Sequence, residues 1–229
     1  MSSNNTPQPS VMPLDREAWK RQLHLSQFIN TYYQCRDLND CIGTTGNLLI
    51  IGPGAGLDAL VMRWKGYKVT TFDIDETFSP DVLGSCHEMP MFKTGQFDAV
   101  IASHVLEHLP LHLLDRALSE ISRVGRFAII YLPVAGRHAQ ISIKPNIRGK
   151  DIGLVMDLFS YWERPSGDCL KYGGGQHYWE IGYRGFRVKD LERRFADHFR
   201  IIRHYRNKDW LPSYNFVLHS HATAEENKS

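Results

Sequence analysis

Long apolar runs are missing from this sequence, and cysteine is scarce. No stretch approaches the ~18 consecutive apolar residues of a membrane-spanning helix, and the first 13 residues carry neither the basic start nor the apolar core of a secretory signal. The four cysteines (Cys35, Cys41, Cys86 and Cys169) form no Cys-x-x-Cys pair, and no Cys/His cluster has zinc-ligand spacing. We therefore expect no metal site, reduced thiols and a cytoplasmic protein.

A large surplus of one charge is also missing. The 27 Lys and Arg residues nearly balance the 25 Asp and Glu residues, giving a net charge of +2. Bulk charge therefore does not predict a nucleic-acid partner. The length of 229 residues suits one domain. Polar residues at both ends predict disordered tails over 1–13 and 221–229, leaving a domain over 14–220.

Strand-like and helix-like patterns alternate within this domain. Apolar runs predict buried strands at 48–51, 68–73, 97–102 and 127–132, with helices at 57–64 and 110–124 between them. A helix over 188–199 precedes two further strand candidates, 200–205 and 214–218. An apolar stripe at Leu25, Phe28, Ile29 and Tyr32 predicts an amphipathic helix from Asp15 to about Tyr33. The alternation indicates an α/β fold with a parallel sheet.

A glycine-rich turn follows the first strand. Gly52, Gly54 and Gly56 would let the chain turn sharply and a ligand approach the backbone. The second strand ends at Asp73, 21 residues after Gly52, where a carboxylate could accept hydrogen bonds from ribose hydroxyls. The dinucleotide fingerprint would need a glycine at Leu57. A nucleoside-containing ligand is expected, and a nicotinamide oxidoreductase is disfavoured.

Two segments carry a family resemblance. Residues 48–76 (LLIIGPGAGLDALVMRWKGYKVTTFDIDE) and 97–110 (FDAVIASHVLEHLP) resemble the class I S-adenosylmethionine (SAM)-dependent methyltransferases, especially the group with a Val-Leu-Glu-His-Leu segment after the fourth strand. The resemblance implies a Rossmann-like fold, with a mostly parallel seven-stranded sheet, helices on both faces and an insertion after the fifth strand. It also implies a methyltransferase that uses SAM.

The resemblance assigns roles to individual positions. Gly52, Gly54 and Gly56 would surround the methionine portion of SAM, and Asp73 would hold the ribose. Ser103 and His104 would lie near the sulfonium. The Asp that contacts adenine in many relatives is replaced by Ser85. The adenine would then be held by backbone at Cys86 and His87 and by the apolar side chain of Met89. Glu107 and His108 are interpreted as local packing and capping residues.

The insertion, residues 133–184, is where we expect the methyl acceptor to bind. Its run from Gly173 to Glu180 predicts either a hinged lid or an aromatic plug over the sheet edge. His177 and Glu180 would share a face of one helical turn, with His177 as general base and Glu180 orienting it. His138 is the alternative base.

The preferred function is methyl transfer to a hydroxyl or amine of a small-molecule or sugar-like acceptor by in-line displacement. An RNA methyltransferase is a second hypothesis, because nine Lys and Arg residues lie between Arg184 and Lys208. A solvated helix face and strand would explain these cations equally well, so a nucleic-acid partner is possible but not favoured. A non-catalytic partner subunit with the same fold is the third hypothesis. No membrane partner is expected.

Overall fold

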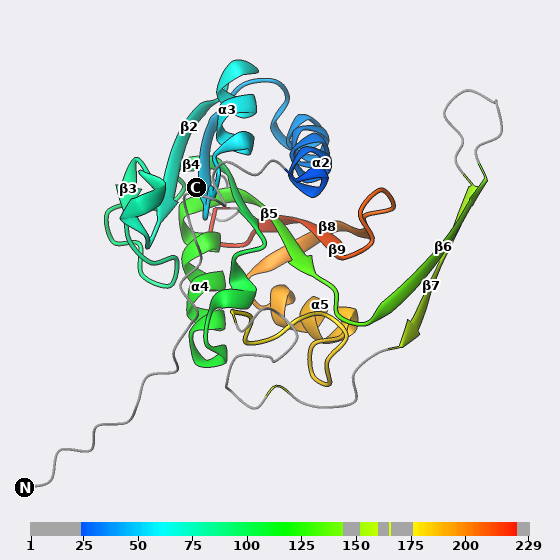
Figure 1. Cartoon of the computed structure of the whole chain (residues 1–229). Helices are drawn as coiled ribbons and strands as arrows, with labels where there is room; N and C mark the ends of the chain where they lie inside the picture. The colour runs from blue at the N-terminus through cyan, green and yellow to red at the C-terminus, as the bar shows by residue number, and fades with distance from the viewer. Residues whose placement is uncertain (1–23, 144–151, 160–164, 166–175, 224–229) are drawn as a thin grey trace, which may run out of the picture.

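A seven-stranded sheet runs through the molecule (Figure 1). The computed structural model describes residues 24–143, 152–159, 165 and 176–223. The strands of this sheet are β1 (Asn47–Ile51), β2 (Lys68–Asp73), β3 (Val82–Leu83), β4 (Phe97–Ser103), β5 (Gly125–Pro133), β8 (Phe199–Arg206) and β9 (Ser213–Ser220). They lie in the order β3-β2-β1-β4-β5-β9-β8, and β9 is antiparallel to both of its neighbours. The predicted fold class is confirmed.

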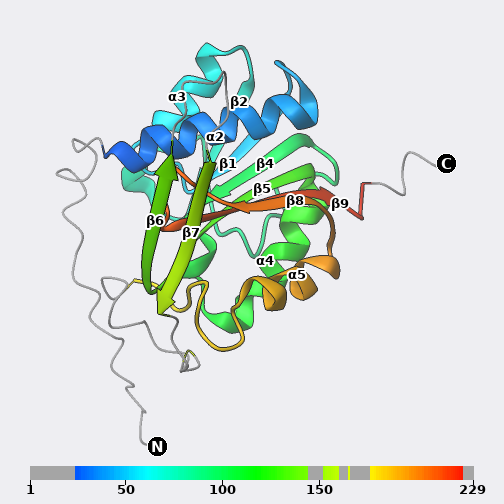
Figure 2. The same ribbon diagram turned by 90° about the vertical axis from the view of Figure 1, so that its right-hand side faces the viewer.

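Helices cover both faces of this sheet (Figure 2). Helices α2 (Leu25–Ile42) and α3 (Leu57–Trp64) pack on one face, while α4 (Leu111–Val124) and α5 (Val188–Ala196) pack on the other. Leu48 and Ile50 of β1 belong to the first core, and Leu49 and Ile51 belong to the second. Both faces of the strand are therefore buried, which explains its uninterrupted apolar run.

Helix α2 differs from its sequence prediction. It extends to Ile42, well past Tyr33, and its part before residue 24 lies outside the described residues. The stripe expected to face the core is largely exposed in the described structure, since Leu25, Phe28 and Tyr32 are 70%, 48% and 66% accessible. The opposite, more polar face is buried instead. Its polar groups are stabilised by hydrogen bonds rather than by apolar packing alone.

Asp37 supplies most of these hydrogen bonds. Its Oδ2 accepts hydrogen bonds of 2.6 Å from the hydroxyls of Tyr131 on β5 and Tyr205 on β8. Its Oδ1 accepts from Arg203 at 2.8 Å, and Arg203 also contacts Asp40 at 2.8 Å. The Asp37 side chain is fully buried. A charged network thus attaches the C-terminal half of α2 to the sheet.

The insertion after β5 begins with a separate antiparallel pair, β6 (Arg137–Ile143) and β7 (Ile152–Phe159). This hairpin extends away from the seven-stranded sheet (Figures 1 and 2). Two short 3₁₀ turns, η1 (Glu76–Phe78) and η2 (Leu106–His108), follow β2 and β4. The predicted tail 1–13 and residues 224–229 lie outside the described residues. Within the described part, no helix combines the length and hydropathy needed to span a membrane.

Candidate active site

The glycine loop after β1 has the backbone geometry that its sequence predicts. Gly52, Gly54 and Gly56 have φ values of 65°, 51° and 77°, which side chains with a Cβ rarely adopt. The Gly52 amide donates a 2.9 Å hydrogen bond to the Phe72 carbonyl of β2. A Cβ on Gly52 would lie 2.5 Å from Cγ2 of Val105, just beyond β4. The loop therefore packs closely against the segment that follows β4.

A cavity of about 330 Å³ opens beside this loop at the carboxyl end of the parallel strands. Parallel α/β sheets bind their ligands at this edge. The cavity is lined by the loop and the start of α3 (residues 52–58), by Ser103 at the end of β4 and His104 after it, by His24 and α2, and by Trp210. Gly52, Gly54, Gly56, Ser103 and His104, all predicted to bind SAM, are thus brought together around one space.

The polar face of α2 forms the opposite wall of the cavity. Its contributing residues are Ser26, Gln27, Asn30, Thr31 and Gln34. Gln34 is only 2% exposed, and its Oε1 accepts no hydrogen bond within the described part of the chain. The sequence analysis missed this wall because it followed the apolar stripe. The informative signal was the i, i+3, i+4, i+7 spacing of small polar and amide side chains on the other face.

Asp58 is a second cavity residue that the sequence analysis missed. It lies in the first turn of α3, and its Oδ1 accepts a 2.8 Å hydrogen bond from the Ala59 amide. Loss of solvation raises the pKa of Asp58 to about 6, although backbone hydrogen bonds act in the opposite direction. The carboxylate therefore lies at the cavity wall, where burial favours its protonated form.

Asp73 lies at the same edge of the sheet, next to the glycine loop. The register Ile51↔Phe72 sets it beside Gly52, although it does not line the cavity. Its Oδ1 accepts from the Asp75 amide at 2.9 Å. The Asp75 carboxylate instead accepts from the amide and hydroxyl of Thr77 and thereby caps η1. Asp73 is the better placed of the two for a ribose.

The residues expected to hold adenine follow β3. Cys86 and Met89 are buried within the apolar core, at 5% and 0% exposure. The Met89 amide donates to Glu120 at 2.7 Å, and Nδ1 of His87 lies 2.6 Å from the Ser85 hydroxyl. None of the three residues lines the cavity described above. An adenine contact at this segment stays a prediction.

Residues 176–184 of the insertion, together with the following Gly185 and Phe186, return to the main sheet. The Ile181 amide donates to the Pro133 carbonyl, and the Tyr178 amide donates to the Glu107 carbonyl at 2.8 Å. Trp179 is fully buried and stacks on Phe186 with ring centroids 4.9 Å apart. This part of the insertion is therefore an aromatic plug, while the glycine run 173–175 lies outside the described residues.

The plug brings His177 against η2. Nδ1 of His177 lies 2.6 Å from Oε1 of Glu180, so the expected pair is formed. It does not lie on a helical turn as predicted, because the segment is held along the end of β5 and η2 by the backbone hydrogen bonds above. Burial lowers the pKa of His177, but Glu180 and Glu107 outweigh it and leave the pKa raised.

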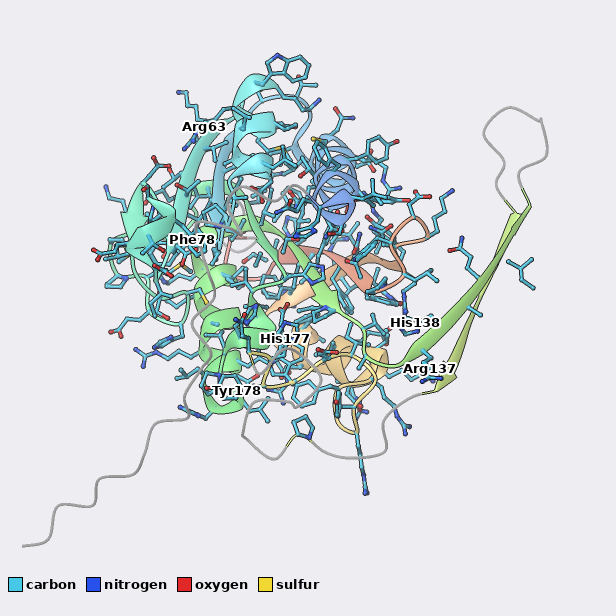
Figure 3. The ribbon with its side chains drawn as sticks, in the orientation of Figure 1. Arg63, Phe78, Arg137, His138, His177 and Tyr178 are labelled. Carbon is cyan, nitrogen blue, oxygen red and sulfur yellow. The ribbon has the colours of Figure 1, made fainter. Side chains whose placement is uncertain are left out.

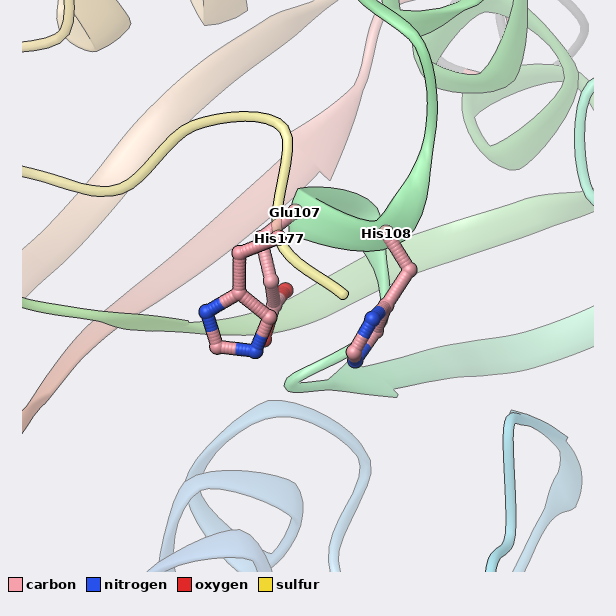
Figure 4. Close-up of side chains that lie close together, drawn as sticks. All are labelled: Glu107, His108 and His177. Carbon is pink, nitrogen blue, oxygen red and sulfur yellow. The ribbon is translucent and has the colours of Figure 1, made fainter. Parts of the chain in front are cut away.

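Glu107 lies beneath this pair and was not predicted as a site residue. It is fully buried, and its Oε1 lies 3.6 Å from Nδ1 of His104. Burial would raise the pKa of Glu107, but His104, His108 and His177 together hold it below its usual value. The rings of His108 and His177 meet edge to face, with centroids 4.8 Å apart (Figure 4). Three histidines thus surround one buried carboxylate.

His138 is located apart from this cluster. It lies at the start of β6, and its Nε2 is 3.3 Å from the Val134 carbonyl. Figure 3 shows His138 beside the base of the hairpin and His177 nearer the centre of the molecule. His138 does not line the cavity.

The basic stretch 184–208 is partly used for internal ion pairs. Arg193 contacts Asp190 at 2.6 Å, Arg194 contacts Asp115 at 3.0 Å, and Arg203 contacts Asp37. Arg206 donates to the Leu211 carbonyl. Helix and strand pairing therefore accounts for several of these cations, which lowers the number available to bind phosphates.

Comparisons with known proteins bear on this arrangement. Residues 49–127 match a family described as a methyltransferase domain. A Pyrococcus horikoshii protein superposes with a TM-score of 0.55 at 14% identity, over 88% of this chain and 93% of its own. A second neighbour is the 1,6-didemethyltoxoflavin-N1-methyltransferase of Burkholderia thailandensis, solved with 1,6-didemethyltoxoflavin and S-adenosylhomocysteine. It superposes with a TM-score of 0.52 at 16% sequence identity, over 94% of this chain and 93% of its own. A glycopeptide N-methyltransferase complexed with S-adenosylhomocysteine superposes with a TM-score of 0.55 at 10% sequence identity, over 84% of this chain and 89% of its own.

No curated protein sequence matches the chain. The match over 49–127 runs from within β1 to the start of β5, including the glycine loop and the segment after β4, and the structural neighbours share the fold. Residues 49–127 are therefore similar to a methyltransferase domain, and the described chain has the fold of these structural neighbours.

Proposed function

We propose that this enzyme transfers the methyl group of SAM to an amine or hydroxyl of a small-molecule or sugar-like acceptor. The observation that carries the proposal is the cavity of about 330 Å³, which joins the glycine loop and His104 to the polar wall of α2. Its volume is at the lower end of the ~300–1,000 Å³ range of small-molecule sites. A compact acceptor fits this space better than a folded RNA does.

The glycine loop is proposed to hold the methionine portion of SAM, and Asp73 the ribose hydroxyls. Asp58 would face the ammonium group of that methionine, since it lines the same space beside Gly56. Ser103 ends β4 and His104 follows it at the carboxyl edge, where the sulfonium would lie. SAM carries its own leaving group, so the protein's main task is to align the acceptor with the methyl–sulfur bond.

The acceptor is proposed to lie between His104 and α2. Asn30 and Gln34 present amide groups there, and Gln34 has the unpartnered oxygen described above. Leaving this buried amide oxygen of Gln34 without a hydrogen bond costs free energy, unless a ligand donates a hydrogen bond to it. An amine or hydroxyl would satisfy it. The two structural neighbours named as N-methyltransferases favour an amine.

The His177–Glu180 pair is proposed to serve the acceptor when it must lose a proton. Glu107 links His177 to His104, which lines the cavity. In the simplest form His177 accepts the proton itself, with Glu180 orienting the ring. His138 stays a rival for this role, but it is not part of the cluster around Glu107.

The test is product detection with SAM carrying a trideuterated methyl group. The enzyme is incubated with a metabolite extract from the source cell and, separately, with its RNA. We expect deuterium in a small amine or hydroxyl compound, and much less of it with the Asp73→Ala variant at a SAM concentration that does not saturate that variant. Label in RNA, lost at high salt, would replace the proposal with the RNA hypothesis. SAM binding with no transfer to either pool would support the non-catalytic partner.

A further inference from the structure

Glu107, His108 and His177 form a cluster with the composition of a metal site. Each offers one ligand atom, and these atoms all lie within 4.8 Å of one another (Figure 4). Glu107 and His108 are consecutive residues of η2, and His177 comes from the insertion about 70 residues later. The backbone hydrogen bond from Tyr178 to Glu107 holds the two segments together.

We infer that these three residues bind a divalent transition-metal ion. Two imidazoles and one carboxylate suit ions such as Zn²⁺, Fe²⁺ and Mn²⁺. Mg²⁺ and Ca²⁺ prefer oxygen ligands throughout. The inference replaces the expectation of no metal site, which rested on sequence spacing alone. His177 lies too far along the chain from Glu107 and His108 for such spacing to reveal the cluster.

The carboxylate gives independent support. Glu107 is fully buried, and neither of its oxygens has a hydrogen-bond partner in the described structure. A buried carboxylate that accepts no hydrogen bond is costly. A bound cation would compensate the charge of Glu107 and would be coordinated by one of its carboxylate oxygens.

Both imidazoles are oriented through their other nitrogen. Nδ1 of His177 lies 2.6 Å from Glu180, and Nδ1 of His108 lies 3.1 Å from the Gln176 carbonyl. A proton on each Nδ1 would leave the lone pair on Nε2 free to bind a metal. Neither Nε2 makes a hydrogen bond to the described residues.

The cluster is also accessible and lies next to the cavity. His108 is exposed, so an ion can enter from solvent, and three protein ligands leave coordination positions for water or another molecule. His104 connects the cluster to the cavity, since it lines the cavity and lies 3.6 Å from Glu107.

This use of the ion rests on the proposed function. The bound ion would hold the acceptor's oxygen or nitrogen and lower its pKa, so that the proton leaves to solvent. His177 would then act as a ligand rather than as the base itself.

The experiment is a titration of the untagged, chelator-treated chain with Zn²⁺, followed by calorimetry, with Mg²⁺ as the comparison ion. We expect one Zn²⁺ per chain and no matching Mg²⁺ binding. His108→Ala should weaken Zn²⁺ binding at least a hundredfold. Glu180→Gln should weaken it about ten- to a hundredfold, as loss of an orienting partner does. His112 is an exposed histidine in the first turn of α4, and His112→Ala should leave Zn²⁺ binding unchanged.

The same preparations are titrated with S-adenosylhomocysteine. Retained binding shows that a variant is folded and that the cofactor site stands independently of the metal. Zn²⁺ binding that is absent, or that persists unchanged in both His108→Ala and His177→Ala, would overturn the inference and leave the methyltransferase proposal intact. Loss of cofactor binding in the unaltered chain would overturn the proposed function instead.

Discussion

Gly52 and Val105 are in such close contact that a Cβ on Gly52 would lie 2.5 Å from Cγ2 of Val105. This contact joins the glycine loop to the segment following β4, two parts of the proposed SAM site. Gly52→Ala should therefore displace the loop and lower SAM affinity more than tenfold, measured by calorimetry. The left-handed backbone at Gly52 adds strain of about 1–2 kcal/mol.

A matched control separates these two effects. Gly66 also has a positive φ, of 100°, but a Cβ there would meet nothing within 4 Å. Gly66→Ala should lower stability and leave SAM affinity unchanged. Adding Val105→Ala to Gly52→Ala removes the clashing methyls and should restore part of the affinity. No restoration would mean that steric contact with Val105 is not the cause.

Asp73→Ala is expected to lower SAM affinity at least tenfold while the fold survives. Hydrogen bonds to a charged group contribute roughly 1.5–3 kcal/mol each, and the carboxylate would accept from ribose hydroxyls. Asp75→Ala is the control, because Asp75 caps η1 through Thr77. The SAM affinity of this variant should stay within about threefold of that of the unaltered chain. Equal losses for both variants would assign the effect to the loop rather than to a ribose contact.

SAM affinity should depend on pH through Asp58. Its pKa of about 6 means that the carboxylate is charged above this pH and largely protonated below it. If Asp58 faces the ammonium group of SAM, affinity falls as the pH decreases from 8 to 5. Titrations across this range should show the decline in the unaltered chain and a much flatter profile for Asp58→Asn. A decline of the same size in the variant would exclude Asp58 as its source.

Asp37→Ala should destabilise the protein by about 3–5 kcal/mol, because it leaves the hydroxyls of Tyr131 and Tyr205 without an acceptor and Arg203 without its buried counter-charge. Asp40→Ala removes the other carboxylate of Arg203. Asp40 is 46% exposed, so that loss should stay within about 1 kcal/mol. Urea denaturation followed by circular dichroism measures both. Similar losses of unfolding free energy for the two variants would show that the burial of Asp37 does not determine its contribution to stability.

His177→Ala should lower turnover by roughly 10²–10⁴-fold and leave SAM affinity within about threefold. His138→Ala should leave turnover nearly unchanged if the cluster around Glu107 serves the acceptor. Steady-state rates with the acceptor found in the deuterium experiment provide the measurement. A large loss of turnover in His138→Ala and little loss in His177→Ala would instead assign the role of general base to His138, at the base of the hairpin.

The strands and the glycine loop were predictable because their signals are local. Four consecutive apolar residues in β1 and alternate strands and helices define a parallel sheet without any tertiary information. The face of α2 was not predictable in this way. Its buried Asp37 depends on Tyr131 and Tyr205, which are 94 and 168 residues away. Hydropathy alone cannot indicate that distant hydroxyls will satisfy a buried carboxylate.

The site shows the same division. Gly52, Gly54, Gly56, Ser103 and His104 follow the first and fourth strands, so their convergence at one edge follows from parallel topology. The pairing of His177 with Glu180 was foreseeable from their separation of three residues. The approach of His177 to Glu107 depends on where the plug docks, which Trp179 and the Pro133–Ile181 hydrogen bond determine.

Helix α2 performs two tasks on separate parts of its length. The residues from Ser26 to Gln34 line the cavity, while Asp37 and Asp40 attach the helix to the sheet. If the methyl acceptor lies against the first half, as proposed, substitutions there can change acceptor selectivity without loosening the attachment made by the second half. A lineage could retune which molecules it methylates by exchanging amides and hydroxyls on three helical turns, leaving the cofactor loop untouched.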